Sequence, residues 1–390
     1  MKIIKAVIIS LLPLFFLCFS YSQGELQATQ TNATDKTTVQ SEDENPLFPV
    51  KLNGKFGFID RTGKIIIEPQ FDGVWSFSEG LALVWNGDFE DGNRGYIDKT
   101  GKYVINPPSP GCASFFEGVA AAKVSENGTK WGYIDKTGKF DIQPQFDFAL
   151  DFSEGLAGIK ICVSWYPLWG FINHKGEIVI RPRYDLVSDF TEGLARATVG
   201  VWTRPDWRTY YIDKAGKWVV SNSFISAGDF SEGLANICED YNKKYGFIDK
   251  TGKYVIEPQF DSALKFSDGL APVACMADAS LKFGYIDKKG TFIILPQFSK
   301  AYNFNDGLAL VRIDRKWKFI NKTGKTVIDS LPDGVPISSN KTPPSFWHGL
   351  AYIPFTDKTT SKTKFALIDK IGKVIFTCEF WDLTYARYSY

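Results

Sequence analysis

The sequence predicts an all-β protein built from tandem repeats of about 38 residues. A hairpin motif such as KYGFIDKTGKYVIEPQF (residues 244–260) recurs nine times, and an element close to Phe-x-acid-Gly-Leu-Ala recurs eight times. The segments around these motifs are rich in aromatic and β-branched residues, as strands are. A repeat of this length is typical of stacked β units.

The first 22 residues are predicted to be a secretory signal peptide. Lys2 and Lys5 precede the apolar run AVIISLLPLFFLCF, and small residues lie on the N-terminal side of a cleavage point before Gln23. The run is shorter than the ~20 residues that a membrane-spanning helix needs. Lipid anchoring through Cys18 is not favoured, because Leu17 stands where a lipoprotein signal has a small residue. We therefore expect an exported protein that is periplasmic, at the cell surface or secreted.

Residues 23–47 contain no aromatic side chain and are predicted to be a flexible linker. Residues 48–390 are then a single β-repeat domain with nine hairpins and eight FSEGLA-type elements. Loss of the signal peptide removes two lysines, so 45 Lys and Arg become 43 against 44 Asp and Glu, a net charge near −1. This balance does not indicate a nucleic-acid partner or an anionic membrane surface. No later apolar run reaches transmembrane length.

The hairpin turn follows from its Asp and its Gly. In DKTG (residues 249–252), the Asp249 carboxylate can accept a bond from the backbone amide two residues on, and Gly252 supplies the left-handed conformation of a type I turn with a G1 bulge. Where Asp is absent, Asn173 and Asn321 preserve the same local bond. These acids are therefore predicted to form turns and not to catalyse a reaction.

The strand after the turn carries a proline and then an aromatic residue. Proline has no amide donor, so we expect strand pairing to end at Pro69, Pro107, Pro144, Pro182, Pro258 and Pro296. The aromatic residues two positions later are predicted to form a stacked core ladder: Phe71, Phe146, Tyr184, Phe224, Phe260 and Phe298.

The FSEGLA element has a Phe three residues before its glycine and an Ala two residues after it, where space is predicted to be tight. An acid precedes the glycine in seven units: Glu79, Glu117, Glu154, Glu192, Glu232, Asp268 and Asp306. His348 occupies this position in the eighth unit. A row of carboxylates can line a ring and bind cations. We favour the alternative that each acid forms part of its own turn.

Loop length varies at only one place in most units. The turn glycine and the FSEGLA glycine are 17 residues apart in the first seven units and 25 apart in the eighth. The gap from the repeat alanine to the next hairpin instead ranges from 9 residues (Ala309 to Lys318) to 15 (Ala351 to Ala366). Function is expected in these adjustable loops, because surface loops on a rigid scaffold carry most binding residues.

The motifs KWGYIDKTG (residues 130–138), QPQFD (143–147) and FSEGLA (152–157) resemble the WG-repeat, or KWG-repeat, family of bacterial proteins. The resemblance covers about residues 48–380. It implies an exported or surface-exposed repeat protein, and no general activity. The naming tryptophan is kept at Trp131, Trp169 and Trp317, whereas other units have a different large aromatic residue there. Residues 329–349 depart most from the pattern.

Two architectures fit these repeats. We favour a propeller-like toroid over an open β-solenoid of stacked hairpins, since closure would hide the strand edges. Nine hairpins against eight FSEGLA elements leave a hairpin pair at the N-terminus, which the C-terminal tail EFWDLTYARYSY can complete as a shared blade. The ring would then have nine blades.

The sequence assigns no catalytic residue, metal site or cofactor. Only His174 and His348 are available to centre a catalytic triad, and the chain has no P-loop, GxSxG or HExxH motif. Five cysteines follow the signal peptide, with no CxxC spacing that would indicate a disulfide framework or a zinc site. Of these, Cys162, Cys238 and Cys275 are predicted to be core residues on equivalent strands.

The adjustable loops of two adjacent units are the candidate ligand site. They read VSWYPLWG and VWTRPDWRTYY, and they hold aromatic and arginine residues beyond those of the repeat. Exposed Trp and Tyr beside Arg are typical of protein-binding and glycan-binding surfaces. The candidate residues are Trp165, Tyr166, Trp202, Arg204, Trp207 and Arg208. The alternative is that these loops pack their own aromatic residues into a local core.

The sequence therefore predicts an exported, non-enzymatic binding or scaffolding protein that presents loops to a protein or a cell-envelope glycan. A dedicated carbohydrate- or cell-wall-binding module is one alternative. A hydrolase or lyase with its site at one mouth of a β ring is another, because paired carboxylates suffice for glycoside hydrolysis.

Overall fold

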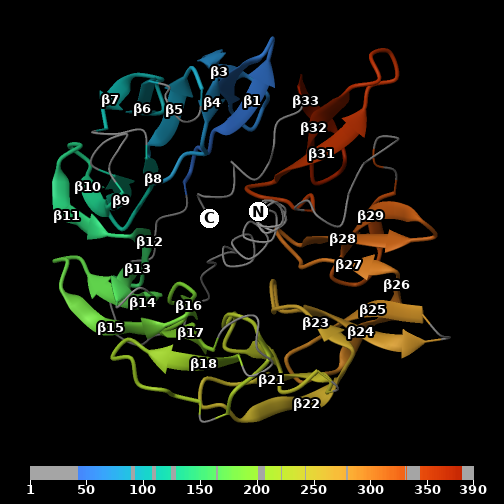
Figure 1. Ribbon diagram of the computed structural model, residues 1–390. Helices are drawn as coiled ribbons and strands as arrows, with labels where there is room; N and C mark the ends of the chain where they lie inside the picture. Colours follow the sequence, from blue (N-terminus) through green and yellow to red (C-terminus); the bar gives the residue numbers. More distant parts are fainter. Residues whose placement is uncertain are drawn as a thin grey trace, which may run out of the picture.

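The protein is a β-propeller of nine small antiparallel sheets, or blades, arranged in a ring. The computed structural model describes residues 43–88, 93–107, 111–123, 129–163, 166–200, 207–220, 222–241, 243–277, 280–329, 331 and 343–379. No helix occurs among these residues. Figure 1 shows the sheets succeeding one another around a central axis in the order of the sequence, which confirms the toroid and rules out the open solenoid.

Each blade is a meander whose first strand is innermost and whose last strand is outermost. Blade 1 contains β1 (Phe48–Leu52), β2 (Lys55–Ile59) and β3 (Ile65–Phe71). Blade 2 contains β4 (Gly73–Val74), β5 (Ala82–Asn86), β6 (Asn93–Ile97) and β7 (Tyr103–Ile105). Blade 3 contains β8 (Cys112–Phe116), β9 (Val119–Lys123), β10 (Trp131–Asp135) and β11 (Phe140–Phe146). Blade 4 contains β12 (Phe148–Ser153), β13 (Leu156–Val163), β14 (Tyr166–Asn173) and β15 (Ile178–Tyr184). Blade 5 contains β16 (Leu186–Val187), β17 (Leu194–Val199) and β18 (Arg208–Asp213). Blade 6 contains β19 (Ser226–Ala227), β20 (Ala235–Cys238), β21 (Tyr245–Ile248) and β22 (Tyr254–Phe260). Blade 7 contains β23 (Ser262–Ala263), β24 (Ala271–Ala277), β25 (Ser280–Ile286) and β26 (Phe292–Phe298). Blade 8 contains β27 (Lys300–Ala301), β28 (Leu308–Ile313), β29 (Lys316–Asn321) and β30 (Thr326–Ile328). Blade 9 contains β31 (Leu350–Thr356), β32 (Thr363–Asp369) and β33 (Val374–Glu379).

Neighbouring blades are joined by a buried aromatic ladder. The aromatic residue of the Gly-Tyr-Ile segment in the third strand meets the FSEGLA phenylalanine of the next blade. The ring centroids are 4.8–4.9 Å apart, as between Tyr133 and Phe152 and between Tyr285 and Phe304. Such edge-on pairs each add about 0.5–1.5 kcal/mol beyond the burial of their area. The predicted aromatic ladder after the prolines is also buried, with exposed fractions of 1–2%. The repeat alanines are buried as well, which is consistent with the predicted lack of space there.

The expectation that pairing stops at the proline is wrong in most blades. Strands β3, β11, β15, β22 and β26 run through their prolines to the aromatic residue two positions on. The missing amide is accommodated by a β-bulge, seen as a register shift between the Phe247↔Ile256 and Tyr245↔Phe260 pairs. Because these strands are outermost, the amide that proline lacks is not needed to pair with a further strand.

The bulge also explains the glycine of the WG motif. A Cβ on Gly132 would lie 2.3 Å from the carbonyl oxygen of Ile142 and 2.7 Å from the nitrogen of Pro144. The bulged backbone therefore fits only against a residue without a side chain. In blade 9, Ala366 stands at this position, β33 has no proline, and the bulge is absent from the regular pairing of 364–367 with 376–379.

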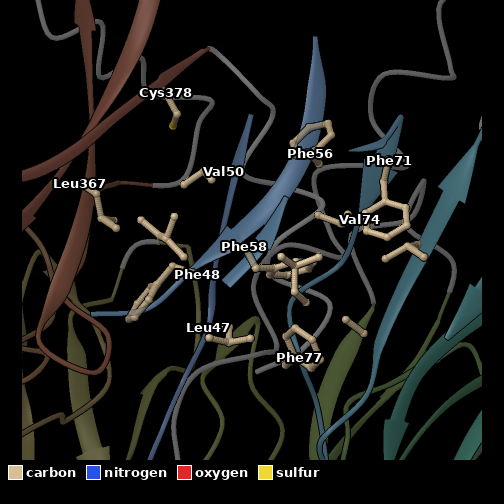
Figure 2. Packing of buried hydrophobic residues seen from close by; sticks show 14 of the residues in the cluster. Leu47, Phe48, Val50, Phe56, Phe58, Phe71, Val74, Phe77, Leu367 and Cys378 are labelled. Carbon is tan, nitrogen blue, oxygen red and sulfur yellow. The ribbon is translucent and has the colours of Figure 1, made fainter. Parts of the chain in front are cut away.

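Blade 9 and blade 1 share the packing of the hairpin-turn glycine with the other pairs of blades. Each hairpin-turn glycine lies against the preceding blade: a Cβ on Gly138 would be 2.9 Å from Ile105, and one on Gly63 would be 2.8 Å from Ile375 across the closure. Figure 2 shows Leu367 and Cys378 of blade 9 facing the side of blade 1 that carries Phe48 and Val50, and all four belong to one buried cluster. The ring is therefore closed by the contacts of the repeat.

Candidate functional site

The two faces of the ring carry different connections. In each four-stranded meander, the FSEGLA turn and the hairpin turn lie at one end of the blade, and we call this side the turn face. The loop between the second and third strands lies at the other end, together with the link to the next blade, and we call this side the variable-loop face. All the adjustable loops of the sequence belong to the variable-loop face.

On the turn face, the repeat acids bind the neighbouring blade. Each adopts a left-handed conformation, with φ between 50° and 55°, and its carboxylate accepts a hydrogen bond from the amide of the next blade's FSEGLA glycine. In blade 5, for example, Glu192 accepts the bond of Gly233 at 3.0 Å. The other amides bound in this way are those of Gly118, Gly155, Gly193, Gly269, Gly307 and Gly349. The sequence predicted only that each acid forms part of its own turn. The structure shows that the acids also connect neighbouring blades.

Cations of the hairpin turns complete this contact. Lys250 of blade 6 lies 3.1 Å from Glu192, and Lys136, Lys214 and Lys288 pair with the acids of their preceding blades at 3.0–3.3 Å. At the closure, Arg61 of blade 1 lies 3.4 Å from Nδ1 of His348 in blade 9. Among the residues that the structure describes, no group of three or more His, Cys, Asp or Glu side chains is placed to hold a metal ion. The acid row forms contacts between blades.

Both histidines lie in these contacts. His174 takes the place of a turn lysine: its Nε2 is 3.0 Å from Glu117, and its ring stacks on Phe152 at 4.0 Å. His348 takes the place of a repeat acid, with φ of 48°, and its ring contacts Trp347. The two residues that could centre a triad are therefore part of the blade contacts on the turn face.

The hairpin aspartates are turn-formers, as predicted. Asp249 accepts bonds from the amides of Thr251 and Lys253 and from the Thr251 hydroxyl at 2.6–3.1 Å. The bond from Thr251, followed by the backbone bonds, holds the pKa of Asp249 below its usual value. Asn173 and Asn321 accept the same pair of backbone bonds.

A second blade contact lies under the variable-loop face. The Asp of the QFD motif binds the lysine that begins the third strand of its own blade and an amide at the end of the second strand of the next. Asp147, for example, pairs with Lys130 at 2.7 Å and accepts the amide of Cys162 at 2.6 Å. At the closure, Glu379 accepts the amide of Gly54 at 3.0 Å. The lysine of the KWG motif therefore has a structural role.

The candidate ligand residues are only partly covered by the structure. Trp165, Trp202 and Arg204 lie outside the described residues. Tyr166 begins β14 with 47% of its surface exposed. Its phenol lies beside Asp185, and partial burial, followed by the bond to Asp185, raises the pKa of Tyr166. Trp207 and Arg208 are half-buried at the start of β18 in the next blade. Tyr166 and the pair Trp207–Arg208 thus lie on one face in adjacent blades, as expected.

The structure adds three exposed side chains from the next two blades. Nε1 of Trp207 donates to the hydroxyl of Tyr241 at 3.3 Å, and Tyr241 is 67% exposed. In blade 7, Met276 and Leu281 face each other across β24 and β25 and are 59% and 38% exposed. The sequence interpretation missed them because it considered only loops with several tryptophans.

The same loops are polar elsewhere in the ring. Exposed residues at the corresponding place are Asn53 and Gly54 in blade 1, Asn86 and Asn93 in blade 2, and Asp314 and Arg315 in blade 8. Among the described residues, exposed apolar side chains of the variable-loop face are therefore grouped in the arc from blade 4 to blade 7, coloured green to yellow in Figure 1, although the loop of blade 6 also exposes Asp240, Lys243 and Lys244. We call Tyr166, Val199, Trp207, Tyr241, Met276 and Leu281 the apolar arc.

A group of charged residues joins blades 5 and 6 near their inner strands. Arg196 binds both carboxylate oxygens of Asp229, at 2.5 and 3.2 Å, and donates to the carbonyl of Ala227. Asp189 is close to this pair, and its Oδ1 is buried without a hydrogen-bond partner. Burial, and then Asp229, raise the pKa of Asp189 to about 7, whereas Arg196 opposes the rise. The sequence interpretation did not single out these residues.

The cysteines correct one prediction. Cys238 is buried, but Cys162 is exposed at the end of β13 and Cys275 is intermediate, so the expectation of three core residues is wrong for Cys162. Burial raises the pKa of Cys238 and of Cys275, and raises that of Cys378 to about 12. These three thiols are therefore poor nucleophiles near neutral pH.

The family model for the WG containing repeat matches residues 56–88, 95–127, 131–161, 169–200, 211–242, 245–275 and 283–317. These matches cover more than half of the chain, and the protein belongs to this family. The first match runs from β2 of blade 1 into the loop after β5 of blade 2, so each sequence repeat spans a blade boundary. No curated protein matches the sequence.

Solved structures share the fold. A eukaryotic initiation factor matches with a TM-score of 0.59 at 10% identity, over 86% of this chain and 96% of that one. A quinonprotein alcohol dehydrogenase-like protein from Bacteroides thetaiotaomicron VPI-5482 matches with a TM-score of 0.37 at 12% identity, over 80% of this chain and 76% of that one. At such low identity, the first likeness concerns the fold alone, and the second carries no argument.

Proposed function

We propose that this protein is an exported binding or scaffolding protein that presents the variable-loop face of blades 4 to 7 to a protein or a glycan of the cell envelope. The observation that carries the proposal is the apolar arc. Its side chains project from the loops of four successive blades, whereas the same loops are polar in blades 1, 2 and 8. Exposed apolar side chains that are grouped in successive loops are typical of an interaction site.

The chemistry of the two faces supports binding over catalysis. The repeat acids and both histidines are engaged in contacts between blades. The variable-loop face instead carries Tyr, Trp and Met side chains, which supply large contact areas at interfaces. The proposal that the protein is exported is based on the N-terminal sequence, which lies outside the described residues. Among those described, no helix is both long and apolar enough to span a membrane.

The proposal is tested by affinity capture from an envelope fraction with matched variants. The double variant Tyr241→Ser, Met276→Ser removes apolar arc residues, and the control Asn53→Ser, Arg315→Ser changes exposed positions in the polar loops. We expect the arc variant to lose a partner that both the wild type and the control retain. A Trp165→Ala, Trp202→Ala variant extends the test to the loops of blades 4 and 5. Equal capture by all four proteins would overturn the assignment of this face.

A further inference from the structure

Blade 5 carries an aromatic pair that the repeat does not require. Tyr210 lies in β18, and Trp218 lies in the outermost segment of the same blade. Their rings stack with centroids 4.2 Å apart and planes inclined by 21°. Trp218 nevertheless remains 45% exposed. The pair is on the rim of the ring, apart from the loops of the apolar arc.

The pair exists because blade 5 lacks the WG glycine. Tyr210 occupies the position of Gly132, Gly170 and Gly246, where a side chain would collide with the bulged outer strand. Blade 5 has no proline in its outer segment, and the described part of that segment pairs with β18 through the bridges Ile212↔Trp218 and Thr209↔Phe224 and the bond from the Val219 amide to the carbonyl of Tyr211. The Tyr210 ring takes the space of the bulge, and Trp218 covers one side of it.

Equivalent aromatic residues elsewhere contact the preceding blade. Tyr103 of blade 2 meets Phe71 edge-on at 6.1 Å, and Phe292 of blade 7 meets Phe260 in the same way. In blade 5 the corresponding ring of the preceding blade, Tyr184, is covered by the guanidinium of Arg183 at 5.0 Å. Trp218 is thus released from the contact between blades and lies flat on Tyr210.

Arg183 is fixed close to this pair. Its Nη2 donates to the carbonyl of Gly216 at 2.6 Å and to the Tyr184 hydroxyl at 2.7 Å. Gly216 is two residues from Trp218, and a guanidinium has five N–H donors in one plane. The adjacent Lys214, Ala215 and Lys217 are exposed. The exposed indole thus lies in a segment that also exposes Lys214 and Lys217 and that is bound by Arg183, so hydrogen-bonding groups are available near it.

We propose that Tyr210, Trp218 and Arg183 form a glycan-binding site on the rim of blade 5. One face of a pyranose ring presents C–H groups, which are apolar and stack on a flat indole, while its hydroxyl groups need hydrogen-bond partners at the edge. The Tyr210 ring holds the indole in a fixed plane, so little conformational entropy is lost on binding. The site is separate from the apolar arc and does not depend on it.

The test uses protein labelled with 5-fluorotryptophan, titrated with chitotetraose, cellotetraose and a soluble peptidoglycan glycan fragment. The fluorine resonance of Trp218 is assigned from its absence in a Trp218→Phe variant. We expect a saturable shift of this resonance with at least one of these glycans. Trp218→Ala is expected to weaken binding by about tenfold, the factor that corresponds to one lost stacking contact of about 1.4 kcal/mol. Arg183→Gln is expected to weaken it as well.

Tyr103→Ala is the matched control, because Tyr103 is 49% exposed at the same repeat position in blade 2 but packs over Gly95. It is expected to bind as the wild type does. Absence of a saturable Trp218 shift with every probe at millimolar concentration would overturn the proposal, as would unchanged binding by a folded Trp218→Ala protein. Capture through the apolar arc is expected to survive Trp218→Ala, so failure here leaves the proposed function standing.

Discussion

The turn face and the variable-loop face are built from the same nine blades, yet their side chains have different roles. On the turn face, the acid of one blade binds the glycine amide and the lysine of the next, from Glu79 to the closure at Arg61 and His348. On the variable-loop face, the recurring contact lies underneath, at aspartates such as Asp147. The residues above it differ from blade to blade. The repeat motifs are therefore concentrated where blades are joined, and variation is confined to the face that is free to bind.

The largest effect is expected inside the blade, at the WG glycine. Gly132→Val places a side chain against the bulged backbone of residues 142–144, where a Cβ alone would be 2.3 Å from a carbonyl oxygen. We expect a loss of unfolding free energy on the order of 3 kcal/mol in a denaturant titration. Ala366→Gly, at the same position of blade 9, is the control and is expected to cost at most about 1 kcal/mol. Similar losses in both variants would contradict the role given to the bulge.

The hairpin turn tests the contact between blades. Gly252 has φ of 85°, and a Cβ there would lie 2.8 Å from Val220 of blade 5. Gly252→Val is expected to cost on the order of 1–3 kcal/mol, because both the backbone and the blade contact are strained. Lys250→Ala removes one exposed ion pair with Glu192 and is expected to cost about 0–1 kcal/mol. Chemical denaturation that gave equal losses would refute the turn assignment.

The repeat acid is expected to contribute less than the turn. Glu192→Ala leaves the Gly233 amide without its acceptor and is expected to cost about 1–2 kcal/mol. Glu192→Gln keeps an acceptor oxygen while it removes the charge, so its loss should be smaller. Thermal unfolding of the two variants separates the hydrogen bond from the ion pair. A glutamine variant as unstable as the alanine variant would assign the effect to charge.

The inner acids predict a dependence on pH. The pKa of Asp189 is raised to about 7, so the folded protein retains this proton up to that pH, whereas an unfolded chain loses it near a pKa of about 4. The stability that the proton confers is present below pH 4 and is lost as the pH rises toward 7. Asp189→Asn removes this loss and is expected to gain up to about 4 kcal/mol relative to the wild type between pH 4 and pH 8, since a shift of about three pKa units corresponds to that free energy. An identical pH profile of unfolding for the two proteins would contradict the raised pKa.

The smallest effect is expected on the variable-loop face. Met276→Ser and Leu281→Ser change exposed residues of the apolar arc, and each should alter the unfolding free energy by no more than about 0.5 kcal/mol. Val273→Ser, three residues before Met276 on the same strand but fully buried, is the control and should destabilise the protein clearly. If the arc variants were as unstable as Val273→Ser, the arc would be part of the core and not a binding surface.

Much of the fold was predictable because the repeat encodes local structure directly. The hairpin turn follows from Asp249 and Gly252, and the core follows from aromatic residues such as Phe260 and Phe266. The bulge at Pro258 was mispredicted, because proline removes a donor and nothing in the strand itself shows that Gly246 makes room for the displaced backbone. The blade contacts of Glu192 were missed for a related reason: its partners lie 41 and 58 residues away.

The candidate site was less predictable than the fold. Tyr166, Trp207 and Arg208 lie on one face of adjacent blades, as expected from their place in the repeat. Tyr241 and Met276 could not be distinguished from core residues by type alone, since exposure depends on how far each hairpin extends beyond its neighbours. The Tyr210–Trp218 pair was hidden because its exposure results from a missing glycine and not from any added motif.

The closure of the ring has a further consequence for how this chain can be cut and rejoined. The junction between β33 and β1 has two kinds of contact that are also found at other junctions, Gly63 against Ile375 and Glu379 to Gly54, and it adds a bond from the Tyr352 hydroxyl to the carbonyl of Pro49 at 2.8 Å. The boundary between blades 9 and 1 is thus held largely as the other blade boundaries are. A circular permutant that opens the ring between two other blades and joins residue 379 to residue 48 by a linker should retain the same set of interfaces, with its loops in the same order around the ring.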